Sequence, residues 1–149
     1  PAVLSAEGHA LGGEALLPRI RDALGPASAV AGVELGGCPL ASAVAGASWA
    51  HGQPIDAVYI RKSSKQHGTR KMLEGADRLG PGDRLVIVED TVTTGGSTLR
   101  AVDAVRDAGF EVAGVIAVVD RLEGGASAIR NAGLIFSTLY DRSDFMGDA

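Results

Sequence analysis

The chain has 149 residues, of which 46% are hydrophobic and 21% charged, which suits one folded domain and argues against a disordered protein. Its formal net charge of -4 gives no overall attraction to nucleic acid or to an anionic membrane, so any bound anion must be held by a local site. The single cysteine excludes an intrachain disulfide framework, and no apolar run approaches the roughly 20 residues that span a bilayer. We therefore expect a cytoplasmic protein with one domain over residues 1–149, without a nucleic-acid or membrane partner.

Helical and extended patterns alternate along the chain. We expect helices at residues 12–24, 39–49, 97–108 and 125–132, and strands at residues 28–33, 57–60, 84–88, 112–119 and 134–139. Residues 62–75 are polar and lack periodicity, which predicts a long loop. Strands that alternate with helices favour a parallel sheet with helices on both faces, and ligands bind such sheets at the carboxyl ends of their strands.

The strongest functional signal joins an apolar strand to a helix over residues 85–99. The strand delivers two adjacent carboxylates, Glu89 and Asp90, and a Thr/Gly-rich loop then opens directly into the helix. Glycines let backbone N–H groups approach an anion, and a helix N-terminus favours a phosphate. Acids beside such a phosphate cradle fit a ribose 5-phosphate. The alternative is an ordinary strand–turn–helix in which Asp90 and Thr94 cap the helix.

A second signal is the basic segment 61–71, in which six of eleven residues are basic or ionisable. Its position after a strand and its hydrophilic, aperiodic character predict a mobile loop. A solvated loop, or a sheet edge protected by lysine, is the alternative. Beside a phosphate cradle, mobile cations and a histidine would stabilise a leaving diphosphate, and a closing loop would exclude water.

Residues 86–98 resemble the signature of type I phosphoribosyltransferases, which bind phosphoribosyl pyrophosphate (PRPP). The resemblance implies their α/β fold, a central mainly parallel sheet flanked by helices with a long mobile catalytic loop. It also implies that the two acids hold the ribose hydroxyls and that the loop after them holds the 5-phosphate. The implied PRPP-binding residues of this segment are Glu89, Asp90, Thr91, Val92, Thr93, Thr94, Gly95, Gly96 and Ser97.

Residues 61–68 closely resemble the catalytic loop of the orotate phosphoribosyltransferases. The resemblance implies that Arg61, Lys62, Lys65 and His67 bind PRPP, and that Arg61, Lys65 and His67 also act in catalysis. It further implies a homodimer that shares this loop across its interface. Mg²⁺ would be held through PRPP and water, without a direct protein ligand. Residues 73–75 would form the returning end of the loop.

Two shorter matches support the same family. Residues 32–41 resemble its pyrophosphate-side turn, with Leu35, Gly36 and Gly37 at the turn itself; a plain strand–helix turn is the alternative. Asp120-Arg121 resembles a pair whose arginine binds the orotate carboxylate, and Thr93 would also touch the base. Arg121 could instead be an ordinary surface arginine. The family's N-terminal hood, with its Ser-Gly motif, has no match in residues 1–13, so we expect the hood to be missing or replaced.

The resemblance implies an enzyme that converts Mg-PRPP and orotate to orotidine 5′-monophosphate and pyrophosphate in de novo pyrimidine biosynthesis. A phosphoribosyltransferase for another nucleobase and a non-catalytic PRPP-binding regulator remain alternatives. The pair Lys65 and His67 favours the enzyme, because a regulator has no need of a catalytic loop.

Overall fold

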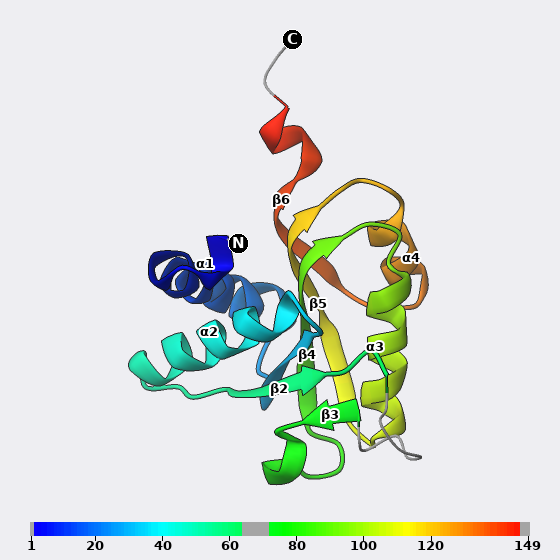
Figure 1. The fold of residues 1–149 in the computed structure, drawn as a ribbon. Coiled ribbons are helices and arrows are strands. Elements are labelled where there is room, and N and C mark those ends of the chain that lie inside the picture. Colours follow the sequence, from blue (N-terminus) through cyan, green and yellow to red (C-terminus); the bar gives the residue numbers. More distant parts are fainter. Residues whose placement is uncertain (1, 64–71, 147–149) are drawn as a thin grey trace.

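The structure, a computed structural model, describes residues 2–63 and 72–146 (Figure 1). The helices are α1 (Ala6–Leu24), α2 (Gly37–Ala50), α3 (Gly96–Asp107) and α4 (Gly125–Asn131), with 3-10 turns at Ala2–Leu4, Ala76–Arg78 and Arg142–Phe145. The strands are β1 (Ala29–Val33), β2 (Asp56–Ile60), β3 (Leu73–Glu74), β4 (Arg84–Val92), β5 (Glu111–Asp120) and β6 (Phe136–Asp141). They form one six-stranded sheet in the order β3-β2-β1-β4-β5-β6.

The sheet confirms the expected α/β class. All of its strand pairs are parallel except β2 with β3, which is an antiparallel edge pair. From β1 the chain proceeds through α2 to β2 on one side, whereas from β4 it proceeds through α3 to β5 on the other. The direction of winding therefore reverses between β1 and β4. In sheets of this kind ligands bind at such a reversal, at the carboxyl ends of the two strands.

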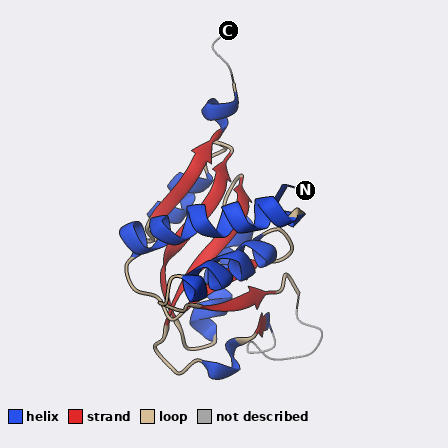
Figure 2. Ribbon diagram, turned by 90° about the vertical axis from the view of Figure 1, so that its left-hand side faces the viewer, coloured by secondary structure: helices blue, strands red, loops and turns tan. Residues whose placement is uncertain are grey.

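The two directions of winding place the helices on opposite faces, because parallel crossovers are right-handed. One face packs against α1 and α2, which cross in front of the strands in Figure 2; this core includes Leu16, Ile20, Leu40, Val86 and Val88. The other face packs against α3 and α4, with Leu85, Ile87, Val102, Val105 and Ile129 among its buried side chains. Successive β4 residues thus serve opposite cores, as the period of two in a strand requires.

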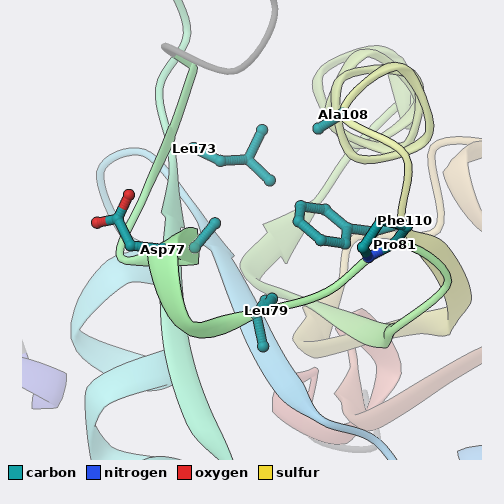
Figure 3. Close-up of a pocket in the computed structure, with 7 residues that line it drawn as sticks. Leu73, Asp77, Leu79, Pro81, Ala108 and Phe110 are labelled. Atoms are coloured by element: carbon teal, nitrogen blue, oxygen red, sulfur yellow. The ribbon is translucent and has the colours of Figure 1, made fainter.

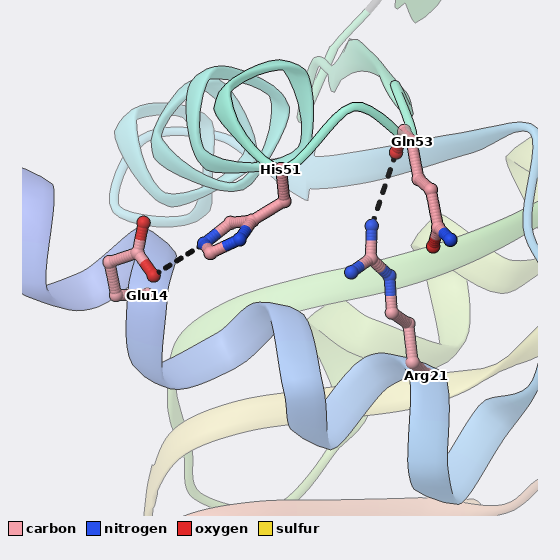
Figure 4. A network of polar contacts seen from close by, with 4 residues as sticks. All are labelled: Glu14, Arg21, His51 and Gln53. Carbon is pink, nitrogen blue, oxygen red and sulfur yellow. Dashed lines mark hydrogen bonds and ion pairs between the residues drawn. The ribbon is translucent and has the colours of Figure 1, made fainter.

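Helices α1 and α2 approach each other closely at Gly13. A Cβ at that position would lie 3.3 Å from the Cβ of Ala47 and would overlap the backbone of Ala43. Polar contacts frame this packing (Figure 4): His51 Nε2 lies 2.8 Å from Glu14 Oε2, and Arg21 Nη2 donates to the Gln53 carbonyl at 3.2 Å. Both are exposed, so packing rather than these contacts supplies most of the stability.

A cavity of about 210 Å³ lies between the turn after β3 and the C-terminal end of α3 (Figure 3). Most of its described lining residues have apolar side chains, among them Leu73, Leu79 and Phe110, and the charged one among them is Asp77. None of these side chains can donate a hydrogen bond to a phosphate. The cavity also lies at the opposite end of α3 from the helix N-terminus that follows β4.

Two boundaries differ most from those expected, and one strand was not expected. Helix α1 begins at Ala6 rather than Gly12, because Ser5 caps it by accepting from the Gly8 N–H at 3.0 Å. Strand β4 continues to Val92, four residues beyond its expected end, since it pairs with β5 as far as Val92↔Asp120. Strand β3 was not expected; it lies at the returning end of the basic loop and pairs with β2. In the part of the chain described, no helix has the length and hydropathy to cross a membrane.

Candidate active site

Three turns meet at the carboxyl ends of neighbouring parallel strands. They follow β1, β4 and β5, and they contain the predicted pyrophosphate-side turn, the phosphate cradle and the Asp120-Arg121 pair, respectively. Residues far apart in sequence therefore share one end of the sheet, as the α/β pattern predicted.

The cradle connects β4 directly to α3 through Thr93, Thr94 and Gly95. Gly95 adopts a left-handed conformation with φ 83°, which glycine tolerates without steric cost, and it is the N-cap of α3. No side chain caps this helix, and Asp90 Oδ1 instead accepts from the N–H of Thr91 at 2.7 Å. The interpretation of Asp90 and Thr94 as helix caps is therefore wrong. The first N–H groups of α3 lack intrahelical partners and are suited to an anion.

The turn after β5 is hydrogen-bonded to the cradle and to the end of β4. Arg121 donates its backbone N–H to the Val92 carbonyl, and Gly125 donates to the Thr93 carbonyl, both at 2.9 Å. A Cβ on Gly95 would lie only 3.2 Å from Gly125 Cα, so the two loops touch through their backbones. The segment that carries Arg121 is thus held in a defined position relative to Thr93.

Glu89 and Asp90 lie on the last part of β4 and face different surroundings. Glu89 is 5% exposed, and its Oε1 accepts from Thr98 Oγ1 at 2.9 Å and from Ser97 Oγ at 3.5 Å. Burial raises the pKa of Glu89 to about 7, and the negative charge of Asp90 adds to the shift, while the bond from Thr98 opposes it. Asp90 is half-buried and close to the surface. Burial therefore disfavours the charged form of Glu89 near neutral pH.

The turn after β1 brings Gly36 against Asp90. A Cβ on Gly36 would overlap the Asp90 carboxylate, and one on Gly37 would overlap the Val88 carbonyl. Leu35 is exposed, and the peptide bond that precedes it is cis. At Gly37 a side chain would overlap backbone, so glycine is required there, whereas at Gly36 a side chain would have to displace the Asp90 carboxylate. The interpretation as a plain strand–helix turn does not account for the contact between Gly36 and an acid of the candidate site.

The start of the basic loop is held beside this turn. Lys62 donates its backbone N–H to Glu34 Oε2 at 2.8 Å, and Arg61 Nη1 lies 2.7 Å from Glu74 Oε1. The positive charge of Lys62 also lowers the pKa of Glu89 slightly against the effect of burial. Lys65 and His67, which were assigned to catalysis, lie outside the residues described.

The turn after β5 positions the predicted carboxylate-binding arginine. The side chain of Asp120, 4% exposed, accepts from the Leu122 N–H at 2.9 Å, and Leu122 takes a left-handed φ of 58° that is uncommon for leucine. Arg121 Nη2 lies 3.0 Å from Glu123 Oε1, with the two side chains 53% and 36% exposed. Arg121 thus presents an accessible guanidinium whose present partner is a carboxylate, the group it is predicted to bind.

The oxygen donors of Glu89 and Asp90 are those that Mg²⁺ prefers. Among the described residues, no group of three or more His, Cys, Asp or Glu side chains could hold a metal ion. A magnesium ion here would therefore depend on oxygens of its substrate and on water for most of its coordination.

The fold and the site together define a class of protein: an α/β enzyme with a phosphate cradle and two carboxylates at the reversal of a parallel sheet. Residues 10–131 match the family model described as phosphoribosyl transferase domain. The chain is 55% identical over 147 residues to the orotate phosphoribosyltransferase of Sorangium cellulosum (strain So ce56), covering 99% of this chain and 76% of that one. It is 44% identical to that of Rhodopseudomonas palustris (strain TIE-1), covering 98% and 78%.

Solved structures agree with the sequence relatives. The orotate phosphoribosyltransferase of Mycobacterium tuberculosis H37Rv in complex with PRPP has a TM-score of 0.82 and 39% identity, covering 97% of this chain and 80% of that one. The chain belongs to the orotate phosphoribosyltransferase family of pentosyltransferases. This confirms the family, the fold and the enzyme class that the motifs implied.

Several residues at the site were not singled out in the sequence. Glu34 and Glu74 hold the start of the basic loop, Glu123 pairs with Arg121, and Arg100 lies one turn into α3. Each is an ordinary charged residue near a motif, and the neighbouring residues in the sequence do not indicate its role at the site. Only the spacing of two between Arg121 and Glu123 places a pair close together along the chain.

Proposed function

We propose that this chain transfers the phosphoribosyl group of PRPP to orotate, giving orotidine 5′-monophosphate and pyrophosphate in de novo pyrimidine synthesis. The observation that carries the proposal is the contact between two loops: the phosphate cradle after β4 is hydrogen-bonded to the turn that carries Arg121. A phosphorylated sugar in the cradle and a carboxylate-bearing base at Arg121 would be adjacent. Family membership supports the same pair of substrates.

The roles proposed for the chain follow from the chemistry of each group. The N–H groups and hydroxyls of residues 93–97 hold the 5-phosphate, Glu89 and Asp90 accept from the ribose hydroxyls, and the turn at residues 35–37 meets the diphosphate. Arg121 binds the orotate carboxylate in a bidentate manner, which a planar guanidinium favours, and Thr93 contacts the ring. All these groups lie at one end of the sheet.

Departure of pyrophosphate leaves positive charge on the anomeric carbon of the ribose. The ring nitrogen of orotate then attacks that carbon, and its N–H proton is released to solvent. Arg61, Lys65 and His67 would stabilise the negative charge on the leaving pyrophosphate, and Lys62 would help to bind PRPP. Positioning and electrostatic stabilisation would supply most of the rate. Magnesium would be held through PRPP and water, without a direct protein ligand, and would offset part of the diphosphate charge.

We also propose a cytoplasmic homodimer in which each subunit supplies its basic loop to the other's site. Complementation tests this arrangement. The variants Lys65→Ala and Glu89→Gln should each be inactive alone. In a mixed dimer, the Glu89→Gln subunit supplies an intact loop to the site of the Lys65→Ala subunit, whose Glu89 is intact. Mixing the two variants should therefore restore part of the activity. If each subunit used its own loop, no mixed dimer would contain an intact site and the mixture would stay inactive.

The reaction itself is tested by adding Mg²⁺, PRPP and one of orotate, uracil, adenine or hypoxanthine, and measuring pyrophosphate release. Release with orotate alone supports the proposal. Release with another base alone shows that this base, and not orotate, is the substrate. A failure to release pyrophosphate with any base, together with a rise in melting temperature on adding PRPP, indicates a PRPP-binding regulator instead. Lys65→Ala should abolish turnover and retain PRPP binding; unchanged turnover would remove Lys65 from the mechanism.

A further inference from the structure

Arg100 lies on α3 one helical turn after the cradle. A long helical side chain points back toward the N-terminus of its helix and covers the turn before it. Four residues before Arg100 stands Gly96, which has no side chain to keep the guanidinium away from the backbone. A Cβ at Gly96 would lie 3.6 Å from Arg100 Nη1 and 4.0 Å from Thr94 Oγ1. The guanidinium and a cradle hydroxyl therefore flank the same glycine.

A cavity of about 110 Å³ independently connects Arg100 with the cradle. Its polar lining consists of Ser97, Arg100, Arg61 and Lys62, and its apolar wall comes from Val33, Ile60, Met72 and Ala101. Among the described residues, no carboxylate lines this cavity and Arg100 has no ion pair. By contrast, Arg61 is paired with Glu74. Among the described residues, Arg100 and Lys62 are thus the two cavity cations without an ion pair, and of these Arg100 lies on the helix that begins at the cradle.

We propose that Arg100 is a further binding residue for the 5-phosphate of the sugar, acting with the N–H groups at the start of α3. This inference rests on the proposed function, because it takes the cradle to hold that phosphate. The proposed diphosphate contacts lie on other elements: the turn at residues 35–37 meets β4 at Asp90 and Val88 rather than at Gly96, and Arg61 and Lys62 line the cavity from the end of β2. Arg100 should therefore discriminate between the two ends of PRPP.

The test measures the dissociation constants of ribose 5-phosphate and of pyrophosphate for the full chain by calorimetry. Arg100→Gln should weaken ribose 5-phosphate binding about tenfold, the size expected for one hydrogen bond to a charged group. Pyrophosphate binding should change by less than about twofold. Arg100→Lys should recover part of the loss, because it keeps the charge but not the fork of donors.

Arg106→Gln is the matched control, since it removes an exposed arginine from the last turn of the same helix. It should leave both constants unchanged. Equal ribose 5-phosphate binding by Arg100→Gln and the unaltered chain would overturn the inference while leaving the proposed function standing. An equal loss for both ligands would also overturn it, because it would show a general charge effect. Failure of the unaltered chain to bind either ligand would instead overturn the proposed function, and this inference with it.

Discussion

The Asp90 carboxylate lies directly against Gly36, although the two residues are 54 positions apart in the chain and belong to different turns. The contact occurs because β1 and β4 are neighbours in the sheet, so the turn after one crosses the end of the other. It leaves no room for a side chain on Gly36. The position of an acid proposed to hold the ribose therefore depends on a glycine in the pyrophosphate-side turn.

Gly36→Ala should displace Asp90 and lower kcat/KM for PRPP by about 10- to 100-fold, because small misplacements of positioning groups are costly. Steady-state kinetics with varied PRPP measure this effect. Gly46→Ala is the control on the adjoining helix α2, where an added Cβ meets nothing within 4 Å. It should stabilise the chain by about 0.5–1 kcal/mol without a change in kcat/KM. Equal kinetics for the two variants would show that Asp90 tolerates the displacement.

The buried carboxyl of Glu89 should make the stability of the chain depend on pH. Its pKa is about 7 in the folded chain against an ordinary value of 4.5, so the folded chain binds this proton more tightly than the unfolded chain does. The contribution of this proton to the free energy of unfolding is therefore fully present below pH 4.5. It is lost as the pH rises through 7, by roughly 3 kcal/mol at most.

Glu89→Gln should remove this dependence, raising the free energy of unfolding at pH 8 by about 1–3 kcal/mol relative to the unaltered chain. Urea denaturation at pH 5 and pH 8 measures the difference. Glu7→Gln, which neutralises an exposed carboxylate on α1, should not change the pH dependence. A Glu89→Gln variant with the original pH dependence would show that Glu89 is not responsible.

Glu123 should compete with the orotate carboxylate for Arg121. Glu123→Gln removes that competitor and should lower KM for orotate by about two- to fivefold, since an exposed ion pair contributes up to about 1 kcal/mol. KM for PRPP should not change. Glu111→Gln removes a carboxylate 4.0 Å from Arg84 at the opposite end of β5 and serves as the control. A raised KM for orotate in Glu123→Gln would show that Glu123 instead holds Arg121 in its working position.

Ser48 should stabilise the fold without affecting the reaction. Its buried hydroxyl accepts from the Ile55 N–H at 2.8 Å and donates to the Ala45 carbonyl at 2.7 Å. Ser48→Ala leaves a buried N–H unsatisfied and should cost about 1–3 kcal/mol in urea denaturation. Ser42→Ala, on the same helix but with an exposed bond to Tyr59, should cost less. Equal losses would show that burial at Ser48 is unimportant.

The alternation of elements and the motif at residues 85–99 predicted the α/β fold, the order of its main helices and strands, and the family. These features are local, because an apolar strand or a glycine loop before a helix depends only on consecutive residues. Element ends were less predictable. Strand β4 extends through Glu89 and Asp90 because β5 pairs with it. The polar residues at this end of the strand have no apolar pattern from which the extension could be predicted.

The sequence by itself thus determined the class of fold and the presence of a phosphate cradle, a basic loop and an Asp-Arg pair. Only the tertiary structure decided which distant residues meet: Gly36 with Asp90, and Thr98 with Glu89. The reason is that local sequence sets the backbone of each element, whereas the order of strands in the sheet sets which turns become neighbours. Burial, and with it the raised pKa of Glu89, exists only once those neighbours are in place.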